Sequence, residues 1–278
     1  MGEIVVGVDG STGSRAALRW AARTADSLGV ALRAVTAWQY PARAGSPIGP
    51  TELPAAAEVD RQSTERLRDV LREELDAAAE RVEVEVGRGP AASVLLGAAA
   101  RPGVAMLVLG ARGLGGFDGL LLGSVSQQCV EHGPCPIVVL RGEHVPSNGP
   151  IVVGLDGSEG AARALEWAID LAKATDSDIV AVHAPRAIDG TRVLDAAAEA
   201  LEQWCAPLRR RDVAYEMRVE AGDARTAIEH AADVSDASLL VVGTRGLGAV
   251  RGLLLGSVAG YVARYATRPI AVVPRSTG

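Results

Sequence analysis

Two glycine-rich segments with one spacing are the residues of this sequence best suited to chemistry. Each reads Gly-x2-Gly-x9-Gly-Ser after an apolar run, with glycines at Gly110, Gly113, Gly123 and again at Gly243, Gly246, Gly256. Glycine permits positive φ and a close backbone approach, so N–H groups can surround an anion. Ser124 and Ser257 stand where helical patterns begin, as helix caps or phosphate ligands, and a helix N-terminus favours an anion. One copy could be a simple turn, but two copies predict phosphate binding.

An aspartate follows the first apolar run of each half. VVGVDGS at 5–11 recurs as VVGLDGS at 152–158, which places Asp9 and Asp156 at the same point of the pattern. In an open parallel sheet this point borders the crevice where ligands bind, and a carboxylate there can accept hydrogen bonds from ribose hydroxyls. The alternative is a local role, in which the carboxylate forms an Asx turn or caps the following helix. A local role and a ribose contact are compatible.

Several chemistries lose support because their residues are missing. Neither half contains the P-loop pattern GxxxxGK[ST], and the first strand is not followed by GxGxxG. The loops hold no evident general base and no carboxylate pair for a metal, so we predict no catalytic residue, no metal site and at most a very slow ATPase. The four histidines, His132, His144, His183 and His230, have no partner at a recognisable motif spacing and are interpreted as structural or solvated.

The two copies of each motif, in the same order, indicate a duplicated domain. We place the domains at 1–145 and 149–278, with the extra residues of the first half around 41–54. Apolar runs alternate with helical patterns. The expected strands are Ile4–Val8, Ala31–Ala37, Val82–Val86, Ala105–Leu109 and Pro136–Leu140, and then 151–155, 178–183, 213–219, 238–242 and 269–273. This order predicts an α/β protein of two tandem Rossmann-like domains, each an open parallel sheet with helices on both faces.

Helical patterns fill the intervals, including a long charged helix from Ala55 to Arg81 with a solvated face. Trp20 and Trp167 occupy matching helical positions and are expected to fill the core. The fifth strands, Ile137–Leu140 and Ile270–Val273, are apolar edges whose backbone would otherwise stay unpaired, so we expect them to pair in a pseudo-twofold arrangement within one chain.

Composition argues against nucleic-acid-binding, redox and membrane proteins. The net charge of −6 and the pI near 5.4 do not suit a polyanion such as nucleic acid. The three cysteines show no metal or redox spacing and are expected to be reduced. The start of the chain has no basic n-region, and no apolar run approaches the length that spans a bilayer, so we expect a cytoplasmic protein with no membrane contact.

The VGVDGS start, the glycine loop and the alternation of five strands with helices resemble the universal stress protein family, and the resemblance covers nearly the whole chain. It implies an ATP-binding domain with a five-stranded sheet in the order 3-2-1-4-5. It also implies a dimer or tandem pseudo-dimer that acts in stress responses. The expected cofactor is ATP, with or without Mg²⁺. The expected partners are an adenine nucleotide and, in a homodimer, a second copy of the chain, while other protein partners stay open.

The resemblance also implies the nucleotide contacts. In the first half they fall on Gly7, Val8, Asp9, Ala37, Gly110, Gly113, Gly123, Ser124 and Val125, with Arg112 in the loop. In the second half they fall on Gly154, Leu155, Asp156, Ala184, Gly243, Gly246, Gly256, Ser257 and Val258, with Arg245 and Arg251 in the loop.

The two loops differ at one charged position. Asp118 in the first loop aligns with Arg251 in the second, whereas Arg112 and Arg245 are common to both. A guanidinium favours a triphosphate and a carboxylate repels it, so the second half is expected to bind ATP more tightly, unless both side chains point to solvent. Asp118 could instead hold Mg²⁺ against the phosphates.

Three functions remain open at this stage. The favoured one is a nucleotide-binding regulatory protein. The first alternative is an enzyme of the related adenine-nucleotide α-hydrolase type, and the second is an interaction module that binds no nucleotide. Trp38, whose counterpart is Pro185, is a further candidate for a position near the adenine ring.

Overall fold

Short β-branched runs and alanine-rich helices alternate along both halves of the chain. A computed structural model describes residues 2–40, 54–114, 122–142, 149–185, 191–247 and 254–275. The first half contains β1 (Glu3–Gly7), α1 (Thr12–Leu28), β2 (Ala31–Trp38), α2 (Ala56–Leu75), β3 (Glu83–Arg88), α3 (Ala91–Ala99), β4 (Val104–Gly110), α4 (Ser124–His132) and β5 (Ile137–Leu140). The second contains β6 (Ile151–Gly154), α5 (Glu159–Thr175), β7 (Ile179–His183), α6 (Thr191–Trp204), α7 (Ala206–Arg210), β8 (Tyr215–Val219), α8 (Ala224–Val234), β9 (Leu239–Gly243), α9 (Ser257–Tyr265) and β10 (Ile270–Val273).

The predicted α/β fold is confirmed, but the two sheets are merged into one. The strands run in the order β3-β2-β1-β4-β5-β10-β9-β6-β7-β8, so each half has the implied order 3-2-1-4-5. Pairing is parallel within each half and antiparallel between β5 and β10, where Ile137 lies opposite Val272 and Val139 lies opposite Ile270. All eight residues of these two strands are buried. Their pairing, which the apolar edges predict, satisfies backbone groups that would otherwise be exposed.

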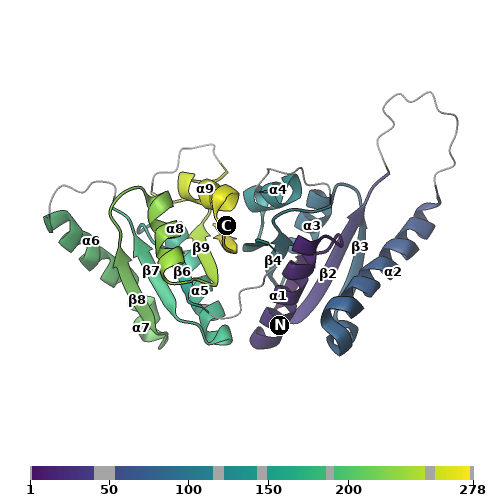
Figure 1. Ribbon diagram of the computed structural model, residues 1–278, viewed down its shortest axis with the longest axis horizontal. Helices are drawn as coiled ribbons and strands as arrows, with labels where there is room; N and C mark the ends of the chain where they lie inside the picture. Colours follow the sequence, from purple (N-terminus) through teal and green to yellow (C-terminus); the bar gives the residue numbers. More distant parts are fainter. Residues whose placement is uncertain are drawn as a thin grey trace, which may run out of the picture.

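Helices cover both faces of this sheet (Figure 1). Side chains of α1, α2, α5, α6 and α7 form one core cluster, and those of α3, α4, α8 and α9 form the other. Successive strand residues alternate between the clusters: Val6 belongs to the first and Val5 to the second, as the two-residue period of a strand requires. Trp20 is buried in the first cluster as predicted, and Trp167 packs against it half-buried.

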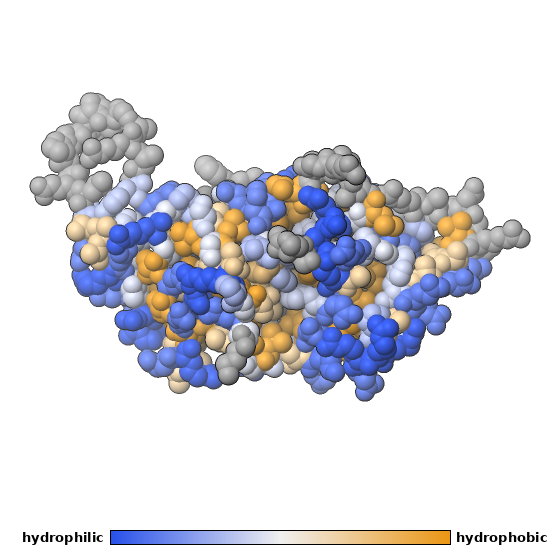
Figure 2. Space-filling model, turned by 180° about the vertical axis from the view of Figure 1, so that it is seen from behind, coloured by the Kyte–Doolittle hydropathy of each residue, from blue (hydrophilic) through white to orange (hydrophobic). Residues whose placement is uncertain are grey.

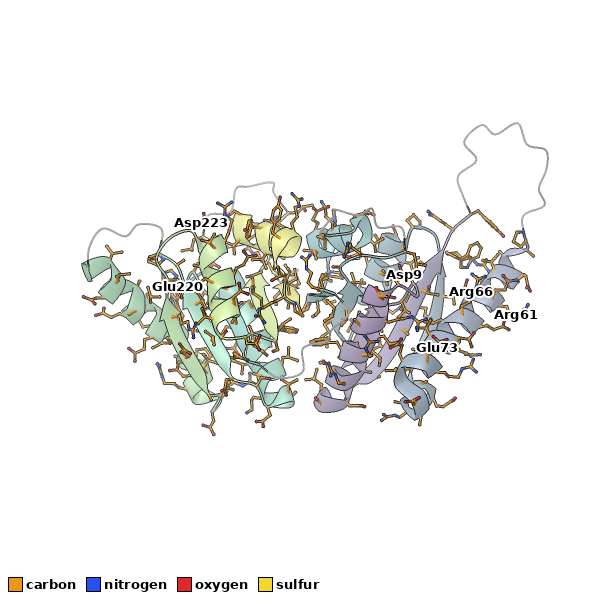
Figure 3. The ribbon with its side chains drawn as sticks, viewed as in Figure 1. Asp9, Arg61, Arg66, Glu73, Glu220 and Asp223 are labelled. Atoms are coloured by element: carbon orange, nitrogen blue, oxygen red, sulfur yellow. The ribbon has the colours of Figure 1, made fainter. Side chains whose placement is uncertain are left out.

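The predicted long helix is shorter than expected. It ends at Leu75 because Asp76 takes a positive φ of 48°, and a 3₁₀ segment continues to Arg81. Its inner side is apolar, with Leu67, Val70 and Leu71 buried, while Arg61 and Glu73 are exposed on this outer helix (Figure 3). Seen from behind, hydrophilic side chains predominate along the lower border of both halves, with hydrophobic residues visible between them (Figure 2). Within the described ranges, no helix is both long and apolar enough to cross a bilayer.

Candidate functional site

An aspartate links two distant loops at the carboxyl edge of each half. Asp156 follows β6, and its Oδ1 accepts a hydrogen bond from the Ser158 amide at 3.0 Å while its Oδ2 accepts one from the Leu247 amide at 2.8 Å. Asp9 repeats this arrangement with the amides of Ser11 and Leu114, both at 3.0 Å. In each half, the bond from the amide two residues after the aspartate forms an Asx turn. The bond to the glycine loop, however, joins segments about a hundred residues apart and shapes the crevice.

The helix caps are the serines that follow these aspartates. Ser11 Oγ accepts from the Ser14 amide at the start of α1, and Ser158 Oγ accepts from the Ala161 amide at the start of α5. The carboxylates therefore form Asx turns and are not helix caps, which decides between the two local alternatives. Each remains free to accept further hydrogen bonds, since an ionised carboxylate offers about four acceptor sites.

Hydrogen bonding controls the ionisation of Asp9. Partial burial raises the pKa of this carboxyl group, but bonds from the Ser11 hydroxyl at 2.6 Å and from the Ser11 and Leu114 amides outweigh that effect. The pKa of Asp9 is therefore held below its ordinary value. The side chain still reaches solvent, and it presents a negative charge at this edge at neutral pH.

The motif glycines serve a purpose different from the predicted one. None of the six takes a positive φ, so of the two properties that glycine offers, close approach rather than left-handed backbone is the one used here. A Cβ on Gly113 would lie 2.3 Å from Asp9 Oδ2, and one on Gly246 would lie 2.1 Å from Asp156 Oδ2. Glycine at these positions leaves room for the aspartate carboxylate, which a larger residue would have to displace.

The first glycine of each motif meets backbone instead. A Cβ on Gly110 would stand 2.5 Å from the carbonyl carbon of Gly13, and one on Gly243 would stand 2.6 Å from that of Gly160. These contacts bring the start of α1 against the end of β4, and the start of α5 against the end of β9. The first two glycines of the pattern thus let the loop pack closely against the start of the first helix and against the aspartate of each half.

The third glycine, not the serine, is the helix cap. Gly123 and Gly256 are the N-caps of α4 and α9, and neither helix has a side-chain capping bond. Ser124 and Ser257 are the first helical residues and are exposed. Of the two alternatives for this serine, a helix cap or a phosphate ligand, the structure therefore excludes the helix cap. Among the described residues no side chain caps the first amides of either helix, which leaves them able to bind an anion.

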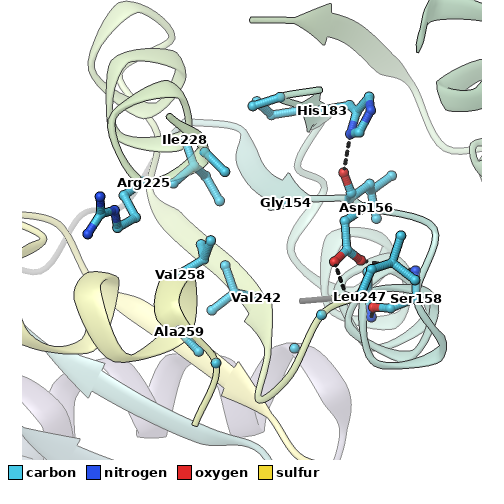
Figure 4. Close-up of a pocket in the computed structure, with 18 of the residues that line it drawn as sticks. Gly154, Asp156, Ser158, His183, Arg225, Ile228, Val242, Leu247, Val258 and Ala259 are labelled. Atoms are coloured by element: carbon cyan, nitrogen blue, oxygen red, sulfur yellow. Dashed lines mark hydrogen bonds between the residues drawn. The ribbon is translucent and has the colours of Figure 1, made fainter. Parts of the chain in front are cut away.

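A cavity of about 690 Å³ lies at this edge of the second half (Figure 4). Polar groups on its wall include Asp156, His183 and Arg225, and apolar ones include Ile228 and Val242. Its lining also contains residues from both ends of the glycine loop, namely Gly243, Arg245, Gly246 and Leu247 at one end and Gly256, Ser257, Val258 and Ala259 at the other. Its volume is in the range of about 300–1,000 Å³ that small-molecule sites occupy.

Comparison with known proteins agrees with this architecture. Residues 1–141 and 148–274 each match the universal stress protein family. A universal stress protein of Mycobacterium tuberculosis is 32% identical over 298 residues, covering 98% of this chain and 96% of the relative. The chain belongs to the universal stress protein family. A second family member, from Mycolicibacterium smegmatis, is 33% identical over 294 residues and covers 97% of this chain and 96% of its own length.

Solved structures show the same fold. A universal stress protein from Archaeoglobus fulgidus superposes with a TM-score of 0.72 at 22% identity, covering 98% of both chains. The domain limits at residues 145 and 149 stay a prediction, since the linker at 143–148 lies outside the described residues.

The structure places most of the predicted contacts of this universal stress protein at the carboxyl edge. In the second half Gly154, Leu155, Asp156, Ala184, Gly243, Arg245, Gly246, Gly256, Ser257 and Val258 all line the cavity. In the first half Gly7 ends β1, Val8 is buried and Val125 packs against the core. The Arg112 carbonyl accepts a bond from Ser11 Oγ at 3.4 Å. Arg251 and its counterpart Asp118 lie outside the described residues.

Trp38 is committed to contacts within the first half of this family member. Its indole N–H donates to Asp60 Oδ1 at 2.8 Å, Tyr40 packs edge-on at 5.0 Å between ring centroids, and Arg88 both pairs with Asp60 and lies over the indole ring. The cluster ties β2 and β3 to α2. The indole N–H of Trp38 is therefore already used in a hydrogen bond within the protein. Ala37 lies one residue before Trp38, at the end of β2.

Several residues of the universal stress protein site were missed by the sequence interpretation. His183, which was interpreted as structural or solvated, lines the cavity, as do Trp204, Asp223 and Arg225. Arg225 forms an ion pair with Asp223 at 2.8 Å and lies over the ring of Tyr261. Aligning the two halves could have revealed Asp223 and Arg225. At the corresponding positions the first half has the uncharged residues Pro90 and Ala92.

The remaining reactive side chains lie elsewhere. Cys129, Cys135 and Cys205 are buried free thiols. Burial raises the pKa of Cys129 and Cys135 to about 12 and that of Cys205 to about 11, which keeps them protonated and unreactive. In the part of the chain that the structure describes, no group of three or more His, Cys, Asp or Glu side chains could hold a metal ion.

Proposed function

We propose that this universal stress protein is a regulatory ATP-binding protein that holds one adenine nucleotide at the carboxyl edge of each half and turns it over very slowly or not at all. One observation carries the proposal. The second-half cavity brings a hydrogen-bonded carboxylate, the start of a helix that has no side-chain cap and an apolar wall into one space of about 690 Å³.

The chemistry of this wall suits the parts of ATP. The free amides at the start of α9 and the backbone of Gly246 and Gly256 would hold the anionic phosphates. Asp156, with acceptor capacity left beyond its two backbone bonds, would accept from hydroxyl groups of the sugar. Ile228 and Val242 would contact the base. Any Mg²⁺ would take most of its ligands from phosphate and water, as this ion commonly does.

Slow turnover is part of the proposal because of how the carboxylates are used. Both oxygens of Asp156 accept backbone hydrogen bonds that hold the carboxylate against the two loops. Asp9 is held in the same way, and its donors lower its pKa, which weakens this carboxylate as a general base. A carboxylate of this kind orients a ligand better than it removes a proton from water.

Analysis of co-purified ligand tests the proposal. Purified protein is denatured, and the supernatant is resolved by anion exchange. Bound ATP supports the regulatory function. AMP or an adenylate indicates the α-hydrolase type of enzyme, and an empty supernatant together with no heat of binding for added ATP indicates an interaction module. An ATP hydrolysis assay on the same sample measures turnover.

Substitution of the carboxylates locates the sites. Asp156→Ala and Asp9→Ala should each weaken ATP binding in one half, measured by calorimetry on the full chain. Asp178→Ala is the matched control, since Asp178 is exposed just before β7, at the opposite edge of the sheet. Equal weakening by the control would place the nucleotide elsewhere.

The location of the protein in the cell and its partners are also part of the proposal. A cytoplasmic location, the lack of a nucleic-acid partner and self-association beyond the intrachain pseudo-dimer remain predictions from the sequence. Fractionation of cells and light scattering of the purified chain measure the first and the last directly.

A further inference from the structure

His183 is the last residue of β7 and is half-buried in the wall of the second-half cavity (Figure 4). Its Nδ1 lies 2.8 Å from the carbonyl oxygen of Leu155. Because a carbonyl can only accept, Nδ1 must carry the proton in this contact. In the neutral ring Nε2 is then a hydrogen-bond acceptor, and no described residue donates to it.

The ring is held from a second side by Trp204. The two ring centroids are 4.9 Å apart and the planes are nearly perpendicular, at 87°. Trp204 also packs over Gly157, where a Cβ would stand 2.5 Å from the indole ring and where φ is +80°. His183 therefore has its orientation fixed by a hydrogen bond to one strand and an aromatic contact to α6, which pre-organises the acceptor.

The first half lacks this arrangement. Gly7 pairs with Val35 as Gly154 pairs with Val182, so the next residues, Thr36 and His183, correspond. At Gly10, the counterpart of Gly157, no described residue apart from its chain neighbours lies within 4 Å of the Cβ position that the indole contacts in the second half. The pairing of His183 with Trp204 is thus specific to one of the two sites.

We propose that His183 determines nucleoside selectivity in the second half, with Nε2 accepting a hydrogen bond from the nucleoside part of the ligand. The inference rests on the proposed function. The donor is a ribose hydroxyl or the exocyclic amine of adenine, and both offer the same chemistry to this acceptor. A ligand lacking the donor leaves Nε2 unpaired in a half-buried wall, so binding should weaken about three- to tenfold, the range of a single hydrogen bond.

The experiment reads the second site separately from the first. The full chain is labelled with 5-fluorotryptophan, and the ¹⁹F resonance of Trp204 is identified among the four tryptophans with Trp204→Phe. ATP, 2′-deoxy-ATP, 3′-deoxy-ATP and purine riboside triphosphate are titrated separately. The last lacks the amine, so the analogue that binds more weakly identifies the donor.

Three variants complete the design. His183→Asn keeps an N–H for the Leu155 carbonyl but places no acceptor at the Nε2 position, so the preference for ATP over the weak analogue should fall to about one. His183→Gln can restore an acceptor near the Nε2 position and should recover part of the preference. Thr36→Ala is the matched control in the first half and should leave the Trp204 titrations unchanged.

The outcomes separate the two hypotheses. ATP titration that leaves the Trp204 resonance unchanged in the wild type overturns both the proposed function of this site and the role of His183. ATP binding with the same ratio among all four ligands in the wild type and in His183→Asn overturns only the role of His183. A preference that is lost in His183→Asn and regained in His183→Gln supports it.

Discussion

The carboxylate of Asp156 occupies the place of a side chain on Gly246, since a Cβ on that glycine would lie 2.1 Å from Asp156 Oδ2. Gly246→Ala should therefore displace the carboxylate from the Leu247 amide and destabilise the protein by about 1 kcal/mol, the range of one hydrogen bond. Chemical denaturation measures this change. In the Asp156→Ala background the obstructing atom is gone, so the same substitution should cost clearly less.

Gly97→Ala is the control for this cycle. Gly97 lies within α3 with open space around its Cβ position, and alanine favours a helix over glycine. It should be neutral or stabilising by up to about 1 kcal/mol. An equal cost for Gly246→Ala in both backgrounds would contradict the steric account.

Valine at the same glycines should abolish nucleotide binding one half at a time. Gly113→Val should affect the first site and Gly246→Val the second, while the fold persists, because the obstruction lies in a loop at the mouth of the crevice. Calorimetric titration of ATP into each variant counts the remaining sites. Full stoichiometry in both variants would reject the assignment of these loops to the nucleotide.

The lowered pKa of Asp9 predicts an acid-dependent contribution to stability. The contribution is complete above the ordinary value of 3.8 and is lost as the pH falls through the lower pKa of the folded state. Because the side chain reaches solvent, we expect no more than about 1 kcal/mol. Asp9→Asn should be less stable than the wild type at neutral pH, and the difference should shrink below pH 3.8. Denaturation at a series of pH values tests this, and a constant difference would count against it.

The seam between β5 and β10 predicts that a substitution in one half loosens the other. Val138 is fully buried opposite Ala271, so the near-isosteric Val138→Thr places an unpaired hydroxyl in the seam. Amide exchange in β10 should rise roughly tenfold for a cost of about 1.4 kcal/mol. Val5→Thr, equally buried in β1, should leave β10 unchanged. Identical exchange profiles would show that the halves do not share stability across the seam.

The charge difference between the glycine loops predicts unequal sites. The second site, with Arg251 in its loop, should bind ATP more tightly than the first site, with Asp118. The expected difference in affinity is about tenfold, or roughly 1–2 kcal/mol after screening. Both residues lie outside the described ranges, so the prediction rests on the sequence. Calorimetry of ATP binding to the wild type, Asp118→Arg and Arg251→Asp at two salt concentrations measures it. A tighter first site in the wild type would refute it.

The sequence by itself determined the features that depend on local pattern and on duplication. The strands at Ile4–Val8 and Ile137–Leu140, the two halves and the pairing of the fifth strands follow from apolar runs, repeated motifs and edges that need partners. The carboxyl-edge location of Asp9 and Asp156 follows too, because residues after parallel strands meet at one edge.

Only the tertiary structure decided why the motif requires glycine and which groups enter the cavity. The carboxylate of Asp156 reaches Gly246 from a segment far away in the chain, and no local spacing encodes that approach. His183 gains its role from Leu155 on one side and Trp204 on the other. Such contacts depend on how helices settle on the sheet, and this packing is set by the whole set of side chains rather than by any one segment.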